Sequence, residues 1–337
     1  MVVSKQRLRG RLLTGERPTG ILHLGHYVGS VRDRLKLQDD YECFFIIADL
    51  HCLTTQYQKK YILEIPENVK NLILDYLAVG INPEKSHIYL QSAITELYKM
   101  NLICEMLIGV SRLQAIQNIK EMAKAAGMKD VSFGLLGYPV LQAADILSLR
   151  ANVIPIGPDE HPQIEIAQEI ARTFNKTYKK IFPIPKIITS EKKILVGLDG
   201  KRKMSKSLKN AIYISDDPET IRRKVARSPI FSKYPEKSPV FIYNDYFNQN
   251  LEEKKLLKKF YREGRLNENQ IKKEVSKVIN QFLEPFRERR AYYEKRPKLI
   301  KEILISGTKR VQREVKETME LVEDVMGFKE IKKLIEK

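Results

Sequence analysis

The sequence has only three cysteines, five histidines and no apolar run near the ~20 residues that span a bilayer. Cys43, Cys52 and Cys104 lack the paired spacing of a zinc site, and their odd number argues against a disulfide framework. The basic N-terminus has no apolar segment or cleavage site of a secretory signal. These absences exclude a membrane protein and a disulfide-stapled secreted domain, so we expect a protein of the reducing cytoplasm.

The distribution of charge divides the chain into two unequal halves. The 337 residues suggest about two domains, and 43% hydrophobic residues suffice for a sizeable core. Residues 201–337 carry 35 Lys and Arg against 21 Asp and Glu, whereas residues 1–200 carry 25 against 21. A basic half fits a polyanionic partner, and lysine-rich solvated helices are an equal alternative.

The first half alternates short apolar runs with helical patterns. We expect a first strand within residues 8–20, followed by a Gly-rich turn, and further strands near residues 43–50, 87–92 and 152–157. Helices are expected near residues 66–80, with Pro66 at the start and Gly80 at the stop, and near residues 162–175. This order predicts an α/β fold with a doubly wound parallel, Rossmann-like sheet. Ligands of such sheets bind beyond the carboxyl ends of the strands.

Strand signals fade after Lys201. Amphipathic helices are expected at residues 218–227, 250–266, 269–297 and 308–327, with a loop at 228–244. We therefore expect a sheet domain over residues 1–200 and a helical domain over residues 201–337.

Two histidines stand three residues apart in "RPTGILHLGHYVGS", residues 17–30. His23 and His26 fall in the first turn of an expected helix, where unpaired N–H groups attract anions. They share one face, and Gly25 between them leaves room for a flat ring against the backbone. The motif predicts a cradle for a nucleoside triphosphate, with two unliganded polar residues at a helix start as the alternative.

The stretch "GLDGKRKMSKSLKN", residues 197–210, predicts a mobile basic loop. Among its residues are the cations Lys201, Arg202, Lys203 and Lys206 and the hydroxyls of Ser205 and Ser207. Such a loop can close over charge that develops on a triphosphate. A plain basic surface loop is the alternative, but the order "KMSKS" is more specific than its composition.

Two further motifs contain carboxylates. Tyr138, Gln142 and Asp145 project from one side of an otherwise apolar expected helix. A buried carboxylate needs a partner, which is either a donor on a ligand or a backbone group of the core. Asp159 follows a strand, where carboxylates hold ribose hydroxyls, although a helix N-cap is the stronger alternative there.

Taken together, "HLGH" and "KMSKS" resemble the two signatures of class I aminoacyl-tRNA synthetases, and the chain is most similar to the bacterial tryptophanyl family. The blocks "IIADLHCLT", "DYLAVGINPEKSHIYLQS", "GYPVLQAADIL" and "EIARTFN" extend the resemblance, most clearly over residues 12–227. It implies an ATP-dependent ligase that forms an aminoacyl-adenylate and then charges its tRNA, tRNA(Trp). Magnesium would arrive on the ATP phosphates, without a dedicated protein site.

The resemblance also implies roles for individual residues. His23, His26, Lys203 and Lys206 would be catalytic. The ATP site would comprise Arg17, Pro18, Thr19, Gly25, His26, Lys120, Gly157, Pro158, Asp159, Leu195, Lys203, Met204, Ser205, Lys206 and Ser207. Asp145 would accept the indole N–H of tryptophan, Tyr138 and Gln142 would hold its α-ammonium, and His51 would border its ring.

Three positions depart from the family pattern. Gln142 stands where many bacterial relatives have Met, Glu160 where a Gln often follows the Asp, and Arg17 where Gln is common. The "YPVLQAAD" spacing is also similar to tyrosyl-tRNA synthetases, so a tyrosine–tRNA ligase is the nearest alternative. A small-molecule nucleotidyltransferase and a non-catalytic nucleic-acid-binding relative are the alternatives from other classes.

The resemblance assigns the remaining segments. Residues 1–200 would be the catalytic domain, with a helical connective segment at about 92–136, and residues 201–337 would bear the KMSKS loop and bind the anticodon. Arg287, Arg289 and Arg290 are candidates for reading bases, or else a solvated helix face. Relatives are homodimers, and residues 96–113 are apolar enough for a dimer interface or a core helix.

Overall fold

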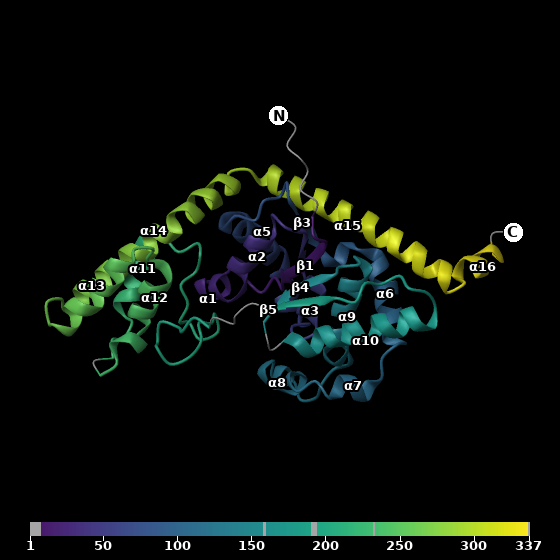
Figure 1. The fold of residues 1–337 in the computed structure, drawn as a ribbon, viewed down its shortest axis with the longest axis horizontal. Helices are drawn as coiled ribbons and strands as arrows, with labels where there is room; N and C mark the ends of the chain where they lie inside the picture. Colours follow the sequence, from purple (N-terminus) through teal and green to yellow (C-terminus); the bar gives the residue numbers. More distant parts are fainter. Residues whose placement is uncertain (1–7, 158–159, 190–193, 232, 336–337) are drawn as a thin grey trace.

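The computed structural model describes residues 8–157, 160–189, 194–231 and 233–335. Five parallel strands form its sheet in the order β3-β2-β1-β4-β5, with helices on both faces (Figure 1). The strands are β1 (Arg11–Glu16), β2 (Glu42–Ile47), β3 (Ser86–Leu90), β4 (Val153–Ile156) and β5 (Lys186–Thr189). The predicted doubly wound α/β fold is confirmed. Sequence patterns missed β5, because this short edge strand is only half-buried.

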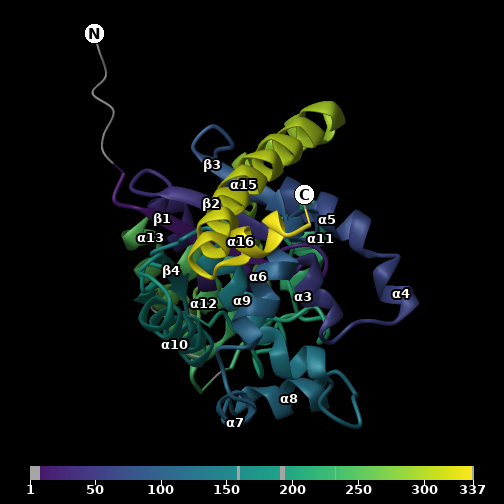
Figure 2. The ribbon, with the colours of Figure 1, turned by 90° about the vertical axis from the view of Figure 1, so that its right-hand side faces the viewer.

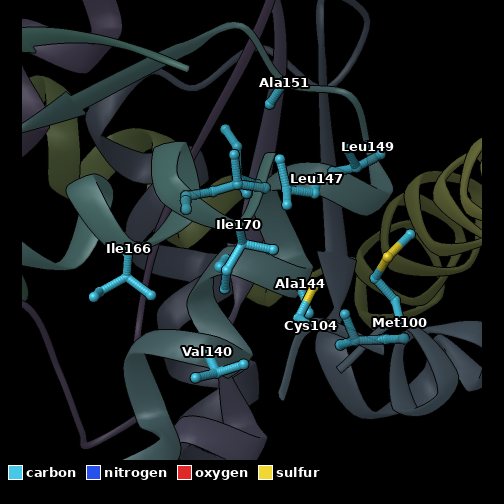
Figure 3. Close-up of a cluster of buried hydrophobic side chains, with 14 of the residues drawn as sticks. Met100, Cys104, Val140, Ala144, Leu147, Leu149, Ala151, Ile166 and Ile170 are labelled. Carbon is cyan, nitrogen blue, oxygen red and sulfur yellow. The ribbon is translucent and has the colours of Figure 1, made fainter. Parts of the chain in front are cut away.

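Successive residues of β1 and β2 point to opposite faces of the sheet, so each face has its own core. On one face Phe44 and Ile46 pack with α6 (Thr95–Glu105), α9 (Phe133–Ser148) and α10 (His161–Thr177). Figure 3 shows Met100 and Cys104 of α6 beside Ala144 and Leu147 of α9 and Ile170 of α10. This packing fixes α9, the helix that carries Tyr138, Gln142 and Asp145.

The other face is covered by α5 (Ile65–Val79), and the long helix α14 (Glu268–Glu294) packs on α5. Phe45 and Ile47 of β2 belong to this second core, together with Tyr76 of α5 and Leu283 of α14. Gly80 ends α5 with φ 109°, a left-handed conformation that favours glycine. The end of α5 was correctly expected from that glycine.

The predicted connective segment is helical. It contains α6, α7 (Val110–Gln114) and α8 (Asn118–Ala125). The short elements around the sheet are α1 (Leu24–His26), a π-helical turn (Tyr27–Val31), α2 (Arg32–Leu37), α3 (Asp49–Leu53) and α4 (Lys59–Ile62). Throughout the described ranges, no helix is both long and apolar enough to cross a membrane.

The second half is helical, as expected, and it contains two helices beyond those expected, at residues 239–247 and 328–333. Its helices are α11 (Pro218–Ala226), α12 (Pro239–Phe247), α13 (Leu251–Arg262), α14, α15 (Pro297–Val325) and α16 (Phe328–Lys333). Helix α12 occupies the end of the predicted loop at residues 228–244, so that part of the loop prediction is wrong. Pro239 starts the helix at its first turn, and Phe241 and Tyr243 are fully buried, which stabilises a helix that the loop-like composition concealed.

Helix α15 does not stay with the rest of the helical half. Figures 1 and 2 show it crossing back over the sheet region beside β3 and α6. A Cβ at Gly307 would lie 2.0 Å from the carbonyl oxygen of Ile88, so glycine permits this close approach. Met319 and Val322 join the α9 core. The segment expected within a helical domain of residues 201–337 therefore covers the sheet, because its apolar stripe is buried there.

Candidate active site

The two histidines form the tip of helix α1, where the sequence predicted a helix start. His23 is the N-cap: its Nδ1 accepts the N–H of His26 at 3.3 Å, and Nδ1 of His26 accepts the N–H of His23 at 3.2 Å. The two rings are stacked, with centroids 3.6 Å apart and planes 16° from parallel. The pair is thus a reciprocal capping arrangement that satisfies two backbone donors.

Both imidazoles are neutral near pH 7. Burial lowers the pKa of His23 to about 3, assisted by the nearby His26 and Lys206. Burial lowers the pKa of His26 to about 4, and the attraction of Glu16 only partly offsets this. A neutral imidazole offers one donor and one acceptor, so at this tip the positive charge comes from other side chains.

The KMSKS loop lies directly on this tip. The N–H of Gly25 donates to Sδ of Met204 at 3.3 Å, although the two residues are 179 apart in sequence. Nζ of Lys206 donates to the carbonyl oxygen of Thr19 at 3.3 Å. A Cβ at Gly25 would lie 3.0 Å from the His23 ring and 3.1 Å from Cβ of Met204. The space that the sequence assigned to a flat ring above Gly25 is here filled by these two side chains.

The backbone after the KMSKS loop is joined to the backbone around the histidines. The N–H of Leu24 donates to the carbonyl oxygen of Ile212 at 2.9 Å, and the N–H of Ile214 donates to that of Leu22 at 3.0 Å. The sequence could not reveal this pairing, because isolated bridges leave no periodic pattern. These two backbone hydrogen bonds fix the segment after the KMSKS loop beside the histidine motif.

A cavity of about 530 Å³ lies at the carboxyl ends of β1, β2 and β4, where the topology predicts a ligand site. Among the predicted residues that line it are Arg17, His51, Tyr138, Gln142, Asp145 and Lys203. Lys203 and Arg17 are exposed and therefore accessible to a ligand. The cavity connects the KMSKS loop to the helix that carries Asp145.

Asp145 is buried at the inner end of this cavity, only 4% exposed. Its Oδ2 lies 3.0 Å from Nε2 of His51, and the amide nitrogen of Gln91 donates to Oδ1 and Oδ2 at 3.0 and 2.9 Å. Burial raises the pKa of Asp145, and these hydrogen bonds oppose the rise. The carboxylate has side-chain partners, not the core backbone partner that was the alternative from sequence.

Gln91 is a site residue that the sequence analysis missed. It is fully buried, and its Oε1 accepts the N–H groups of Leu50 and His51 at 3.1 and 3.4 Å. Gln91 thus ties the start of α3 to Asp145. The available signal was a polar residue near the carboxyl end of the expected strand at residues 87–92, at the edge where sites form.

Gln163 and the Glu16–Arg34 pair were also missed. The amide nitrogen of Gln163 donates to the hydroxyl of Tyr138 at 2.7 Å, inside the cavity wall. Nη1 of Arg34 lies 2.6 Å from Oε1 of Glu16, and both residues line the cavity. Burial alone would raise the pKa of Glu16, but Arg34, His26 and Arg17 hold it below its ordinary value. Glu16 therefore remains an anion next to the histidine tip.

Several other predicted ATP-site residues are not among those that line this cavity. Pro18 is buried beside the exposed Thr19, and Oγ of Ser205 lies 3.0 Å from Oγ of the exposed Ser207. The N–H of Gly157 donates to Oε2 of Glu160 at 3.3 Å.

The last four predicted residues are less directly connected with the cavity. Lys120 is exposed on α8, and Met122 of the same helix lines the cavity. Leu195 is buried in the core, and its carbonyl oxygen accepts the N–H of Met204. Leu195 therefore supports the KMSKS loop from below. Pro158 and Asp159 lie outside the described residues.

Comparisons with known proteins agree with this geometry. A family model described as tRNA synthetases class I (W and Y) matches residues 5–284. The tryptophan–tRNA ligases of Treponema pallidum and Borreliella burgdorferi are 47% and 48% identical to the chain over 327 residues. These alignments cover 94% of this chain and 97% and 93% of those proteins. The tryptophanyl-tRNA synthetase of Campylobacter jejuni, solved with ADP and tryptophan, superposes with a TM-score of 0.85 at 29% identity, covering 94% of this chain and 99% of that one.

The fold, the two joined signature motifs and the family match define the class: the chain belongs to the class I tRNA synthetases. Within that class it belongs to the bacterial-type tryptophanyl-tRNA synthetases, the tryptophan–tRNA ligases. The protein is therefore an ATP-dependent aminoacyl-tRNA ligase, and the alternative of a small-molecule nucleotidyltransferase is rejected.

Proposed function

We propose that the protein activates L-tryptophan with ATP to tryptophanyl-adenylate, releases pyrophosphate, and transfers the tryptophanyl group to the terminal adenosine of tRNA(Trp). The observation that carries this proposal is the contact of the histidine tip with the KMSKS loop, next to a cavity that leads to the buried Asp145. Adenylate formation needs positioning and charge neutralisation more than an acid–base pair.

At the amino-acid end, Asp145 accepts the indole N–H of the substrate. Its carboxylate is already held by His51 and Gln91, so little reorganisation accompanies binding. Tyr138 and Gln142 on the same helix hold the α-ammonium, with Gln163 orienting the Tyr138 hydroxyl. A site built to pair a buried donor rejects phenylalanine strongly, because phenylalanine would leave the carboxylate unpaired.

At the phosphate end, Lys203 and Lys206 stabilise the charge that develops on the triphosphate, and Arg17 and Lys120 contribute further cations. Burial lowers the pKa of Lys206, while Asp75 and Glu16 act against that change. Magnesium comes with ATP as part of the substrate, bound by phosphate oxygens and water. Gly157, Pro158 and Asp159 hold the ribose, and Thr19, Gly25 and the KMSKS serines complete the ATP site.

The basic second half binds tRNA(Trp), and two copies of the chain form a homodimer in the cytoplasm. Helix α6 supports the homodimer, because it buries Leu97 and Met100 on one side and exposes large apolar residues on the other. The exposed residues of α6 are Tyr98 and Leu102, and the exposed Met106 and Val110 follow directly after the helix. A solvent-exposed apolar row of this kind is typical of an interface with another protein.

The decisive experiment is ATP–pyrophosphate exchange with a panel of amino acids. We expect exchange with tryptophan and none with phenylalanine. Exchange with tyrosine alone would reassign the protein as a tyrosine–tRNA ligase. Charging of tRNA(Trp) should follow, and tRNA affinity should fall with salt by ~0.7–0.9 per phosphate contact on a log–log plot.

A further inference from the structure

Asp75 is a carboxylate in the middle of α5 with no exposed surface. Its Oδ2 accepts the N–H of Leu22 at 2.7 Å, and its Oδ1 pairs with the guanidinium of Arg290 from α14. A buried carboxylate is costly unless it is paired and hydrogen-bonded, and Asp75 meets both conditions. Asp75 is the first residue of the block "DYLAVGINPEKSHIYLQS" that extended the resemblance, but the sequence analysis assigned it no role.

Each of the three guanidinium nitrogens of Arg290 has a partner in this arrangement. Its Nη2 donates to Oδ1 of Asn71 at 2.8 Å and its Nε to Oε1 of Glu294 at 2.8 Å, and the residue is 8% exposed. Arg290 therefore neither reads bases nor lies on a solvated face, which were the two expectations from sequence. Its guanidinium instead joins α14, which continues to the outer end of the helical half, to α5 beside the sheet (Figure 1).

The group that Asp75 holds immediately precedes the histidine tip. Leu22 is followed by His23, and the Leu22 carbonyl accepts the N–H of Ile214 from the segment after the KMSKS loop. The same carboxylate is also one of the anions that act on Lys206, opposing the fall in its pKa that burial causes. One buried carboxylate thus acts on both signature motifs.

We propose that Asp75 is a positioning residue for adenylate formation, which fixes the histidine tip against the KMSKS loop, and that Arg290 links this tip to the helical half. Asp75 touches neither substrate in this scheme and acts through the Leu22 backbone and Lys206. This inference rests on the proposed function, because it assumes that ATP is bound between the two motifs.

The test is a double-mutant cycle in tryptophan-dependent exchange. Asp75→Asn keeps an acceptor for Leu22 but removes the charge. We expect its kcat to fall about 10-fold with the KM for tryptophan nearly unchanged. In a Lys206→Ala background the same substitution should cost less than about 3-fold, because its effect passes partly through Lys206. Glu288→Gln is the matched control, since Glu288 is an exposed carboxylate of α14, two residues before Arg290. It should exchange like the wild type.

Equal losses from Asp75→Asn in the two backgrounds would overturn the proposal and leave Asp75 a purely structural residue. If Asp75→Asn does not fold, Arg290→Lys replaces it in the same cycle, because lysine keeps the cation and the fold while losing the forked geometry. Wild-type kcat in folded Arg290→Lys would equally overturn the proposal. A wild-type enzyme without tryptophan-dependent exchange would refute the proposed function itself, which is a different result.

Discussion

The two ends of the cavity are built differently. At the amino-acid end, Asp145 is buried and already hydrogen-bonded to His51 and Gln91. At the phosphate end, Lys203 and Arg17 are exposed, and Nζ of Lys206 donates a hydrogen bond to the carbonyl oxygen of Thr19. The amino-acid end is a completed network of hydrogen bonds. The phosphate end is a set of cations on the KMSKS loop and at Arg17.

The difference follows from what each end must do. Distinguishing tryptophan from other amino acids requires a rigid acceptor that is in position before binding, because rejection depends on an unmet hydrogen bond. Stabilising a triphosphate in its transition state requires cations that can follow the developing charge. Changes at the two ends should therefore affect different kinetic constants.

The largest effect is expected from Lys206→Ala. Removal of a cation that acts on transition-state charge should lower kcat for exchange about 10²–10³-fold. The KM for tryptophan should change little, since Asp145 is untouched. Steady-state exchange kinetics measure both constants, and Lys201→Ala, an exposed lysine of the same loop, is the control expected to retain activity. A large rise in the KM for tryptophan would contradict the separation of the two ends.

Asp145→Asn should lower kcat/KM for tryptophan about 10²-fold. This pattern is the opposite of that expected for Lys206→Ala, which leaves the KM for tryptophan nearly unchanged. The near-isosteric amide turns a donor toward the donors of Gln91 or His51, so the network is left with an unmet hydrogen bond. The KM for ATP should stay within about 2-fold. Exchange kinetics with each substrate varied in turn decide this, and an unchanged preference for tryptophan over tyrosine would remove Asp145 from the amino-acid site.

Gly25→Ala tests the junction between the ends, with an expected loss of about 10-fold in kcat. The added Cβ would press on the His23 ring and Met204, so the KMSKS loop has to shift by a few tenths of an ångström. Gly134→Ala in α9 is the matched control, because its Cβ would meet no atom within 4 Å. If both variants exchange at the wild-type rate, close contact of the loop with the tip is unimportant for activity.

The last prediction concerns the contribution of the histidine tip to stability at low pH. An unfolded histidine has a pKa of about 6.5, whereas His23 has about 3, so below pH 6.5 the unfolded chain binds protons that the folded chain does not. This contribution is present above pH 6.5 and is lost as the pH falls, by about 2 kcal/mol at pH 5.

His23→Asn preserves the cap acceptor but cannot titrate, so its free energy of unfolding should vary less between pH 6.5 and 5 than that of the wild type. Urea unfolding at each pH provides the comparison. Parallel pH profiles for the two proteins would show that the buried tip does not contribute in this way.

The sequence alone determined the α/β class, four of the five strands and the position of the histidines at a helix start. These features rest on local patterns: continuous apolar runs, a terminating Gly80 and the spacing of His23 and His26. Helical spacing also predicted that Tyr138, Gln142 and Asp145 lie on one side of α9. All three line the same cavity, which confirms this prediction.

Only the tertiary structure decided which distant groups meet. Gln91 reaches Asp145 because β3 ends beside α9, and Arg290 reaches Asp75 because α14 packs on α5. Helix α15 lies over the sheet because its apolar residues are buried in the core that contains α9. A sequence records the period of an element, but the partner of a buried polar group depends on how elements pack, and that is a property of the whole fold.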